Sequence, residues 1–452
     1  MKTARQCIVV AFLTAAVLSR AAATSTNHNS LIDLPTALRL AGAQNLDLQI
    51  ARQRLNEAKA NQANTVWQFF PAITVGVGYR RHDELIQNVE GRILDVSKES
   101  YTVGPSLSGQ LDLGDAIYRN LAARQLVRAS DYARETQRFE TLLSAAQDYF
   151  DLVKAAHALQ VARDALSIST NYAAQLEQAV AAGIAFKGDL LRVQVQTERY
   201  RATLRQDEEQ QRLASARLAQ TLHLDPAVEL TPADDKPIAV ELLSLTTPLD
   251  SLVALALANR PEAQQNVAVA QAARYVKNGA VYGPLIPQLG AQIFAGGLGG
   301  GPRGGEDRFG MSEDYAVTLG WRIGPGGLFD HSRVHAAESR LAIAELTREK
   351  ATDEIIRQVV ENHARVHSIA DQLLYARRAI EQGGEALRLT QQRKEFAVGA
   401  VLEVIQAEQE LTRGRLDLVN LVAEFNKREY ALLRAVGRYP PSAPTNAPSS
   451  SP

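Results

Sequence analysis

Two kinds of hydrophobic pattern alternate along this chain, and the first has a period of two. It is clearest at residues 314–324, where four apolar side chains face one way and small or polar ones face the other: Val317, Leu319, Trp321 and Ile323. This alternation predicts a β-strand between lipid and water, with these four residues on the lipid side. On this pattern alone, a hairpin in a soluble sheet remains an equally good interpretation.

The second pattern is helical and much longer. Residues 118–182 lack proline and have almost no glycine, and residues 331–398 also lack proline. Each stretch is about 65 residues, or about 100 Å of α-helix. Apolar residues recur at every seventh position in both stretches and in the segment after the second one, which is typical of a coiled coil. They are Leu152, Leu159, Leu166, Ala173 and Val180; Val359, Val366, Leu373, Ile380 and Leu387; and Val404, Leu411, Leu418, Phe425 and Leu432.

The order of these segments occurs twice, which indicates an internal duplication. Ala-Gln-Asn-Leu-Asp-Leu-Gln at 43–49 corresponds to Ala-Asn-Arg-Pro-Glu-Ala-Gln at 258–264. Each copy reads as helix, strand, loop, strand, very long helix, turn and helix. We expect the first copy at 31–225, with strands near 72–80 and 101–113. We expect the second at 248–437, with strands near 287–296 and 314–324.

Between the paired strands we expect two external loops. The first, 80–100, is rich in charge, and the second, 296–310, is rich in glycine but lacks the Gly-Lys-Ser/Thr of a phosphate-binding loop. Four strands are too few to close a membrane barrel, and open sheet edges cannot face lipid. The chain must therefore oligomerise if its sheet spans a membrane. A trimer would supply twelve strands, although four strands per chain do not by themselves fix the number three.

The N-terminus predicts export from the cytoplasm. Lys2 and Arg5 precede an apolar run at 7–18, and Ala21-Ala22-Ala23 offers a cleavage site, so residues 1–23 read as a secretory signal peptide. A short membrane anchor is the alternative. The only cysteine is Cys7, inside this segment, so the mature chain would have no disulfide or thiolate chemistry. At the other end, residues 438–452 are rich in Pro, Ser and Ala and are expected to be disordered.

The signal, the duplicated unit and the two helical turns together resemble the TolC-type outer-membrane efflux protein family, over about residues 31–437. Residues 396–411, Phe-Ala-Val-Gly-Ala-Val-Leu-Glu-Val-Ile-Gln-Ala-Glu-Gln-Glu-Leu, look like the family's Val-Gly turn followed by acidic-Val-Leu-x-Ala-Gln. Residues 181–191 form the corresponding turn of the first copy. The resemblance implies an α+β membrane protein. Three chains would form a 12-stranded outer-membrane β-barrel, four strands per chain, continuous with a long periplasmic α-helical coiled-coil barrel.

The resemblance also assigns roles to residues at the two turns. Docking of a periplasmic adaptor would involve five of them: Gly183, Ile184, Val398, Gly399 and Ala400. At the pore aperture, Glu403 takes the place of an acidic residue that forms a charged ring, and Gln406 is neutral where the family has a second acid. Asp189 lies in the matching turn of the first copy. Asp189 and Glu403 could also stabilise the N-terminus of a helix, where the helix dipole favours negative charge, and this role is compatible with a place at the aperture.

The implied function is an outer-membrane exit duct of a tripartite efflux or type I secretion system. Its partners would be further copies of itself, a periplasmic adaptor (membrane fusion protein), an inner-membrane transporter of the RND, ABC or MFS type, and outer-membrane lipid. A periplasmic coiled-coil scaffold or adaptor without a barrel is the alternative, but it leaves the strand pairs unexplained. The pattern does not identify the cargo.

Other chemistry has weak support in the sequence. The formal net charge of −1 gives no reason to expect nucleic-acid binding. No catalytic arrangement stands out, so we expect neither an enzyme nor a cofactor. Two histidine pairs at i, i+4 spacing, His331/His335 and His363/His367, would each lie on one helical face. This spacing suits zinc, but no carboxylate completes an HExxH motif, so both pairs are interpreted as surface residues.

Overall fold

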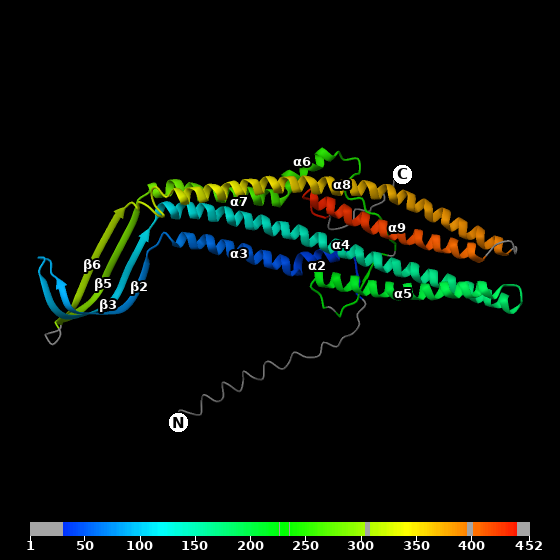
Figure 1. Ribbon diagram of the computed structural model, residues 1–452, viewed down its shortest axis with the longest axis horizontal. Helices are drawn as coiled ribbons and strands as arrows, with labels where there is room; N and C mark the ends of the chain where they lie inside the picture. The colour runs from blue at the N-terminus through cyan, green and yellow to red at the C-terminus, as the bar shows by residue number, and fades with distance from the viewer. Residues whose placement is uncertain (1–29, 226, 235, 303–307, 396–400, 441–452) are drawn as a thin grey trace, which may run out of the picture.

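A four-stranded sheet occupies one end of the molecule, and long helices extend from it to the other end (Figure 1). The computed structural model describes residues 30–225, 227–234, 236–302, 308–395 and 401–440. The predicted signal peptide at 1–23, the turn residues Val398, Gly399 and Ala400, and the tail beyond residue 440 lie outside these ranges. We call the end at which α4 ends and α5 begins the tip.

The elements follow the duplicated order. The first copy contains β1 (Ser30–Ile32), α2 (Leu34–Gln44), α3 (Leu46–Trp67), β2 (Ala72–Gln87), β3 (Ile93–Leu111), α4 (Leu113–Ala181) and α5 (Lys187–Thr221). The second contains β4 (Leu230–Pro232), α6 (Leu249–Asn259), α7 (Pro261–Tyr282), the 3₁₀ turn η1 (Gly283–Leu285), β5 (Gln288–Pro302), β6 (Arg308–Gly320), α8 (His331–Glu395) and α9 (Val401–Ala435). The long helices α4 and α8 thus occupy equivalent places in the two copies.

The first pair of strands is longer than the sequence pattern predicts. β2 continues to Gln87 and β3 begins at Ile93, so most of the expected loop at 80–100 is antiparallel ladder. The ladder bonds are main-chain bonds and need no apolar side chains. Polar groups pair across it instead: the Tyr79 hydroxyl donates to Glu99 at 3.0 Å, and the Ser97 hydroxyl donates to Asp83 at 2.6 Å.

The glycine-rich segment is also mainly strand rather than loop, because β5 continues to Pro302 and β6 begins at Arg308. Gly297 and Gly299 of β5 pair with Met311 and Phe309 of β6, respectively. A Cβ added to Gly297 would lie 2.4 Å from Cζ of Phe309. The glycines therefore leave room for the Phe309 ring over the strand, and glycine at such positions does not indicate a loop.

The end of β6 corrects another expectation. Trp321 and Ile323, predicted on the lipid-facing strand, come after its last residue, Gly320. The Trp321 indole N–H donates to the Leu285 carbonyl at 3.1 Å, and Ile323 forms an isolated bridge with Leu328. Gly324 and Gly326 follow with φ of 99° and 76°, conformations that turn the chain from sheet to helix. Val317 and Leu319 lie within β6.

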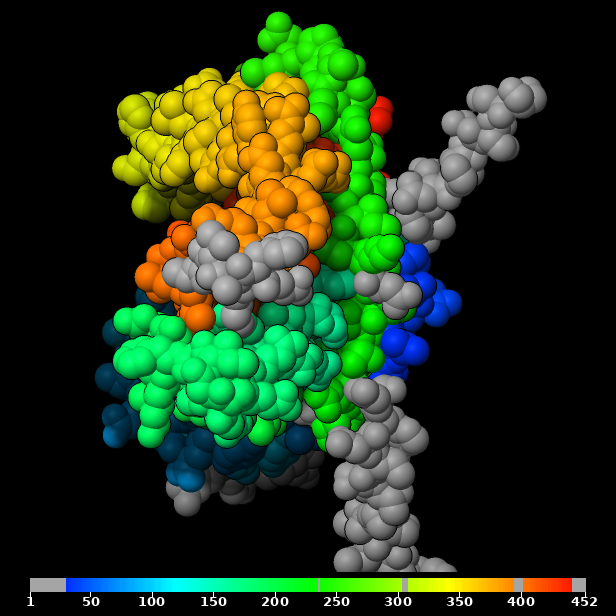
Figure 2. Space-filling model, turned by 90° about the vertical axis from the view of Figure 1, so that its right-hand side faces the viewer, coloured from blue at the N-terminus to red at the C-terminus, as the bar shows by residue number. Residues whose placement is uncertain are grey.

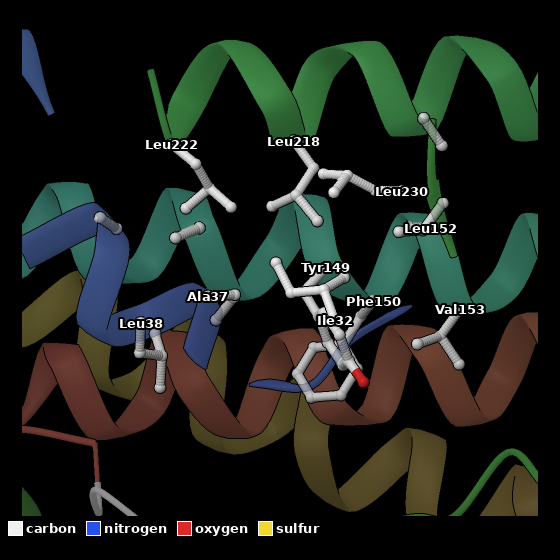
Figure 3. Packing of buried hydrophobic residues seen from close by; sticks show 14 of the residues in the cluster. Ile32, Ala37, Leu38, Tyr149, Phe150, Leu152, Val153, Leu218, Leu222 and Leu230 are labelled. Carbon is white, nitrogen blue, oxygen red and sulfur yellow. The ribbon is translucent and has the colours of Figure 1, made fainter. Parts of the chain in front are cut away.

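The hydrophobic core is concentrated midway along the helices, in a region that we call the belt. It consists of two clusters, one centred on Tyr149 of α4 and one on Val359 of α8, both with 0% exposure. In the first cluster, side chains from β1, α2, α4 and α5 meet (Figure 3). Ten of the heptad residues named above are buried: Leu152, Leu159, Val359, Val366, Leu373, Leu387, Val404, Leu411, Phe425 and Leu432. Leu418 is partly buried and packs against the second cluster.

Candidate functional site

One face of the sheet is apolar across all four strands. Directly paired residues of an antiparallel sheet point to the same face. One such row is Val77, Val103, Gly297 and Met311, and another is Ile73, Leu107, Ile293 and Tyr315. The opposite face has rows of small and polar residues, such as Ala72, Ser108, Gln292 and Ala316.

The apolar side chains of this face lie in the open. Val77 is 84% exposed, Val317 71% and Leu319 67%. Such a continuous exposed apolar surface marks a contact with lipid or protein. Within the part of the chain that the structure describes, no helix is both long and apolar enough to cross a membrane.

The sheet also has two open edges. Its strand order is β2-β3-β5-β6, so β2 and β6 are the outer strands, with 16 and 13 residues. Among the described residues, neither strand has a partner on its outer side. Each edge therefore presents a row of main-chain groups that can pair with another chain.

At the tip, the first helical hairpin turns through Gly183. This residue has φ of +75°, and its N–H donates to the Val180 carbonyl at 3.0 Å, while the Ile184 N–H donates to Ala179 at 2.9 Å. These two bonds form a Schellman motif, which ends a helix at a residue with positive φ. The turn expected at 181–191 is therefore present, and the chain reverses at Gly183.

The turn presents apolar side chains to solvent. Ile184 is 84% exposed and Phe186 73%. Phe186 was not among the predicted site residues, although it directly precedes α5. Gly188 accommodates it, because a Cβ there would lie 2.3 Å from Cε1 of the Phe186 ring. An aromatic residue beside a turn glycine was the signal in the sequence that could have identified it.

The predicted aperture residues lie in or near the first turns of α5 and α9. Asp189, in the first turn of α5, accepts a bond from Arg192 Nη1 at 3.1 Å. Glu403, in the first turn of α9, forms an ion pair with Arg393 Nη1 of α8 at 3.6 Å, longer than a hydrogen bond. Gln406 is exposed. The sequence analysis missed Arg393, because it belongs to the preceding helix and only the fold brings it to Glu403.

The histidine pairs show no complete metal site. His363 and His367 have their Nε2 atoms 3.1 Å apart, and burial together with the neighbouring His367 lowers the pKa of His363. The His335 ring is 3.6 Å from Glu338. Among the described residues, no group of three or more His, Cys, Asp or Glu side chains could hold a metal ion.

Comparisons with known proteins agree with this architecture. The chain matches the outer membrane efflux protein family twice, over residues 37–222 and 252–438, so the match repeats along the duplicated sequence. No curated protein matches the sequence.

Several solved structures are similar to this fold. One is a membrane protein from Pseudomonas aeruginosa, with 21% identity, a TM-score of 0.77 and coverage of 89% of this chain and 93% of that one. Another is the outer membrane protein VceC of Vibrio cholerae, with 18% identity, a TM-score of 0.72 and coverage of 90% and 96%. A third is the open state of the Neisseria gonorrhoeae MtrE outer membrane channel, with 17% identity, a TM-score of 0.73 and coverage of 90% and 89%.

These findings support transport rather than catalysis, and they favour the exit duct over the periplasmic scaffold. The family match covers most of the chain, and solved structures with the same fold include outer-membrane channels. Such a channel lies in the outer membrane and has a large helical part in the periplasm. The chain belongs to the outer membrane efflux protein family.

Proposed function

We propose that three copies of this chain form one exit duct, with a twelve-stranded barrel in the outer membrane and a tube of helices below it. The observation that carries the proposal is the sheet: one face is apolar across all four strands, and both edges are open. In lipid, unpaired main-chain groups cost several kcal/mol each, on the order of the cost of burying a polar group. Pairing β6 of one copy with β2 of the next removes every open edge, and three copies give a strand number typical of closed barrels.

The tips of the helical hairpins would receive the adaptor. Ile184 and Phe186 supply exposed apolar side chains beside the turn at Gly183. Such side chains on a surface turn suit contact with another protein. Val398, Gly399 and Ala400, outside the described residues, would serve the same purpose in the second hairpin. An inner-membrane transporter of the RND, ABC or MFS type would supply the driving force.

The aperture would lie where α5 and α9 begin, with Glu403, Gln406 and Asp189 around it. A ring of three Glu403 carboxylates would attract cations. The Arg393 guanidinium, 3.6 Å from each carboxylate, offsets part of that charge. Glu403→Gln would leave Arg393 unpaired, so we expect it to shift the channel from cation preference towards anion preference.

The first test is extraction of the outer membrane with detergent, then size-exclusion chromatography with light scattering and conductance in planar bilayers. The proposal predicts a trimer with discrete conductance, and reversal potentials in a salt gradient that change with Glu403→Gln. A conducting trimer whose selectivity ignores Glu403 would retain the duct and remove the acidic ring. A protein released without detergent and without conductance would overturn the duct.

Two neighbouring residues of β6 test which face of the sheet meets lipid. Val317 lies on the apolar face and Thr318 on the opposite one. Lysine at position 317 should destabilise the membrane-inserted trimer by about 2–4 kcal/mol, as for a charge near the bilayer midplane. The matched variant Thr318→Lys adds the same charge and should assemble normally. Equal assembly of both variants, measured as heat-resistant trimer, would contradict the assignment of faces.

A further inference from the structure

A cavity of about 390 Å³ lies near the tip, between the two helical hairpins of one chain. Its walls come from α4 (168–175), α8 (387–391) and the first two turns of α9. Figure 2 looks along the molecule onto this end, where α4 and α5 lie beside α9. The volume falls within the range of small-molecule binding pockets, about 300–1,000 Å³.

The cavity wall combines apolar and polar side chains and contains one carboxyl group. Apolar side chains come from three helices: Ile168, Leu387 and Val404. Amide side chains come from α4 and α8: Asn171, Gln175 and Gln391. Tyr172 adds a phenol. Glu408 is the only lining residue whose side chain can carry a charge near neutral pH. A wall that combines apolar side chains and neutral polar groups with one carboxylate suits an amphipathic organic cation.

Glu408 is the unusual member of this wall. It is only 3% exposed, and its Oε1 accepts no hydrogen bond from the described residues. Burial raises the pKa of Glu408 to about 7. A buried carboxylate without a partner is costly, so a cation in the cavity would stabilise it.

Among the described residues, burial is the one cause that shifts the pKa of Glu408, and no cation lowers it. Burial raises the pKa of the phenols of Tyr172 on α4 and Tyr200 on α5, and the nearby charge of Glu408 raises both further. Asp189 also raises the pKa of Tyr172. On α8, the guanidinium of Arg393 pairs with Glu403 instead. The adjacent Gln409 donates to Gln196 of α5 at 2.8 Å.

We propose that this cavity binds an amphipathic organic monocation, with its apolar group against Ile168, Leu387 and Val404 and its positive centre against the Glu408 carboxylate. A metal ion fits less well, because it needs several close oxygen ligands and would occupy a small part of the space. The inference deepens the proposed duct by naming a class of molecule held at its tip. Binding in the cavity does not depend on the proposed duct; only the role of this binding in export rests on the proposed function.

The test is isothermal titration of benzyltriethylammonium into the full-length protein extracted in detergent, at pH 8. We expect saturable binding that Glu408→Gln weakens at least tenfold, since the variant keeps the shape of the side chain and removes its charge. Glu410→Gln is the matched control, because Glu410 is an exposed glutamate of the same helix, and its affinity should stay within twofold of the wild type. Benzyl alcohol, which keeps the aromatic ring and lacks the charge, should not bind measurably.

Two further measurements keep the proposal falsifiable if Glu408→Gln perturbs the fold. Asn171→Asp adds a second carboxylate at an exposed part of the wall and should tighten binding severalfold. Lowering the pH from 8 to 6 should weaken binding to the wild type about tenfold and leave Glu408→Gln unchanged. Equal affinity in the wild type and Glu408→Gln, no binding to the wild type, or equal binding of benzyl alcohol would overturn the proposal. Bilayer conductance of Glu408→Gln is measured separately, so the site can fail while the duct stands.

Discussion

The belt and the tip treat a buried glutamate of the same helix in different ways. In the belt, Glu429 of α9 is fully buried, and its Oε2 accepts main-chain N–H groups of Leu242 at 3.0 Å and Leu243 at 3.2 Å. At the tip, Glu408 is almost as buried, and its Oε1, like Oε1 of Glu429, has no hydrogen-bond partner among the described residues. Unlike Glu429, Glu408 lines a cavity. Burial of a carboxylate is therefore not sufficient to indicate a binding site. The distinguishing feature is a buried carboxylate that the protein leaves unsatisfied beside a cavity.

The surroundings of Glu429 in the belt are also more extensively packed and hydrogen-bonded than those of Glu408 at the tip. The belt combines two large apolar clusters with a polar network in which Arg434 donates to Gln358 at 2.9 Å, to Glu262 at 2.6 Å and also to Glu140. The tip has two small clusters, around Leu190 and around Leu387. Local stability follows apolar contact and satisfied bonds, so the tip should open at lower free energy than the belt. This distribution would suit the proposed aperture at the tip.

Removing the belt's central cation should have the largest effect on stability. Although burial opposes ionisation, the bond from Arg260 and the charge of Arg434 lower the pKa of Glu262. Arg434→Met would remove part of this compensation from Glu262, whose side chain is 20% exposed, and breaking a fully buried pair typically costs about 3–5 kcal/mol. We expect a loss of unfolding free energy at the lower end of this range, because the Glu140 side chain, another partner of Arg434, is 44% exposed. Denaturant unfolding followed by circular dichroism measures it.

The control for this variant is Arg428→Met on the same helix. Arg428 pairs with Glu424 at i, i+4, with side-chain exposures of 30% and 40%. A pair of this kind contributes about 0–1 kcal/mol. Comparable losses in the two variants would contradict the view that the network around Arg434 holds the belt.

The pH dependence at the tip should have the next largest effect. Burial raises the pKa of Glu408 in the folded protein to about 7, against 4.5 for an unperturbed glutamate, so the unfolded chain loses this proton first as the pH rises. The contribution of Glu408 to stability is therefore most favourable below about pH 4.5 and becomes unfavourable as the pH rises to 7. At pH 8, Glu408→Gln should be more stable than the wild type by about 3 kcal/mol, from 1.36 kcal/mol per pKa unit.

The measurement is the difference in unfolding free energy between Glu408→Gln and the wild type at pH 5 and pH 8, in detergent without organic cations. The difference should be small at pH 5 and large at pH 8. A difference that does not change with pH would show that Glu408 is neutral or paired in the assembled protein. The exposed Glu410→Gln should show no such change.

The sequence predicted the long elements well because their patterns persist over many residues. The heptads that include Val359 and Phe425 are buried as expected, and the duplicated order of elements is present. The strand ends were predicted less well. Polar residues such as Glu99 and the glycines around Gly299 lie in regular ladder, because main-chain pairing does not depend on side-chain polarity.

The charge interactions at the tip could not be predicted from the sequence, because they depend on contacts between residues far apart in the chain. Glu403 was identified through the turn motif, but its partner Arg393 comes from the preceding helix. Glu408 looked like one polar residue among several after the turn, and its isolation follows only from the packing of α4, α5 and α9 around it. The turn at Gly183 could be predicted, because a helix end with glycine is a local signal.

That turn provides the smallest and most local test of the comparison. Gly183 has φ of +75°, and a Cβ there would meet no atom within 4 Å, so Gly183→Ala introduces backbone strain without a steric clash. We expect a loss of about 1 kcal/mol, the typical cost of placing a non-glycine residue in the left-handed region. Gly384, within α8, also has open space around its Cα but does not have positive φ, so Gly384→Ala should stabilise the helix by about 1 kcal/mol. Hydrogen exchange at the tip should rise in the first variant and fall in the second, while exchange in the belt stays unchanged. A loss of protection in the belt with Gly183→Ala would mean that the tip and the belt unfold as one unit, and the contrast between the two buried glutamates could then not be attributed to separate local stabilities.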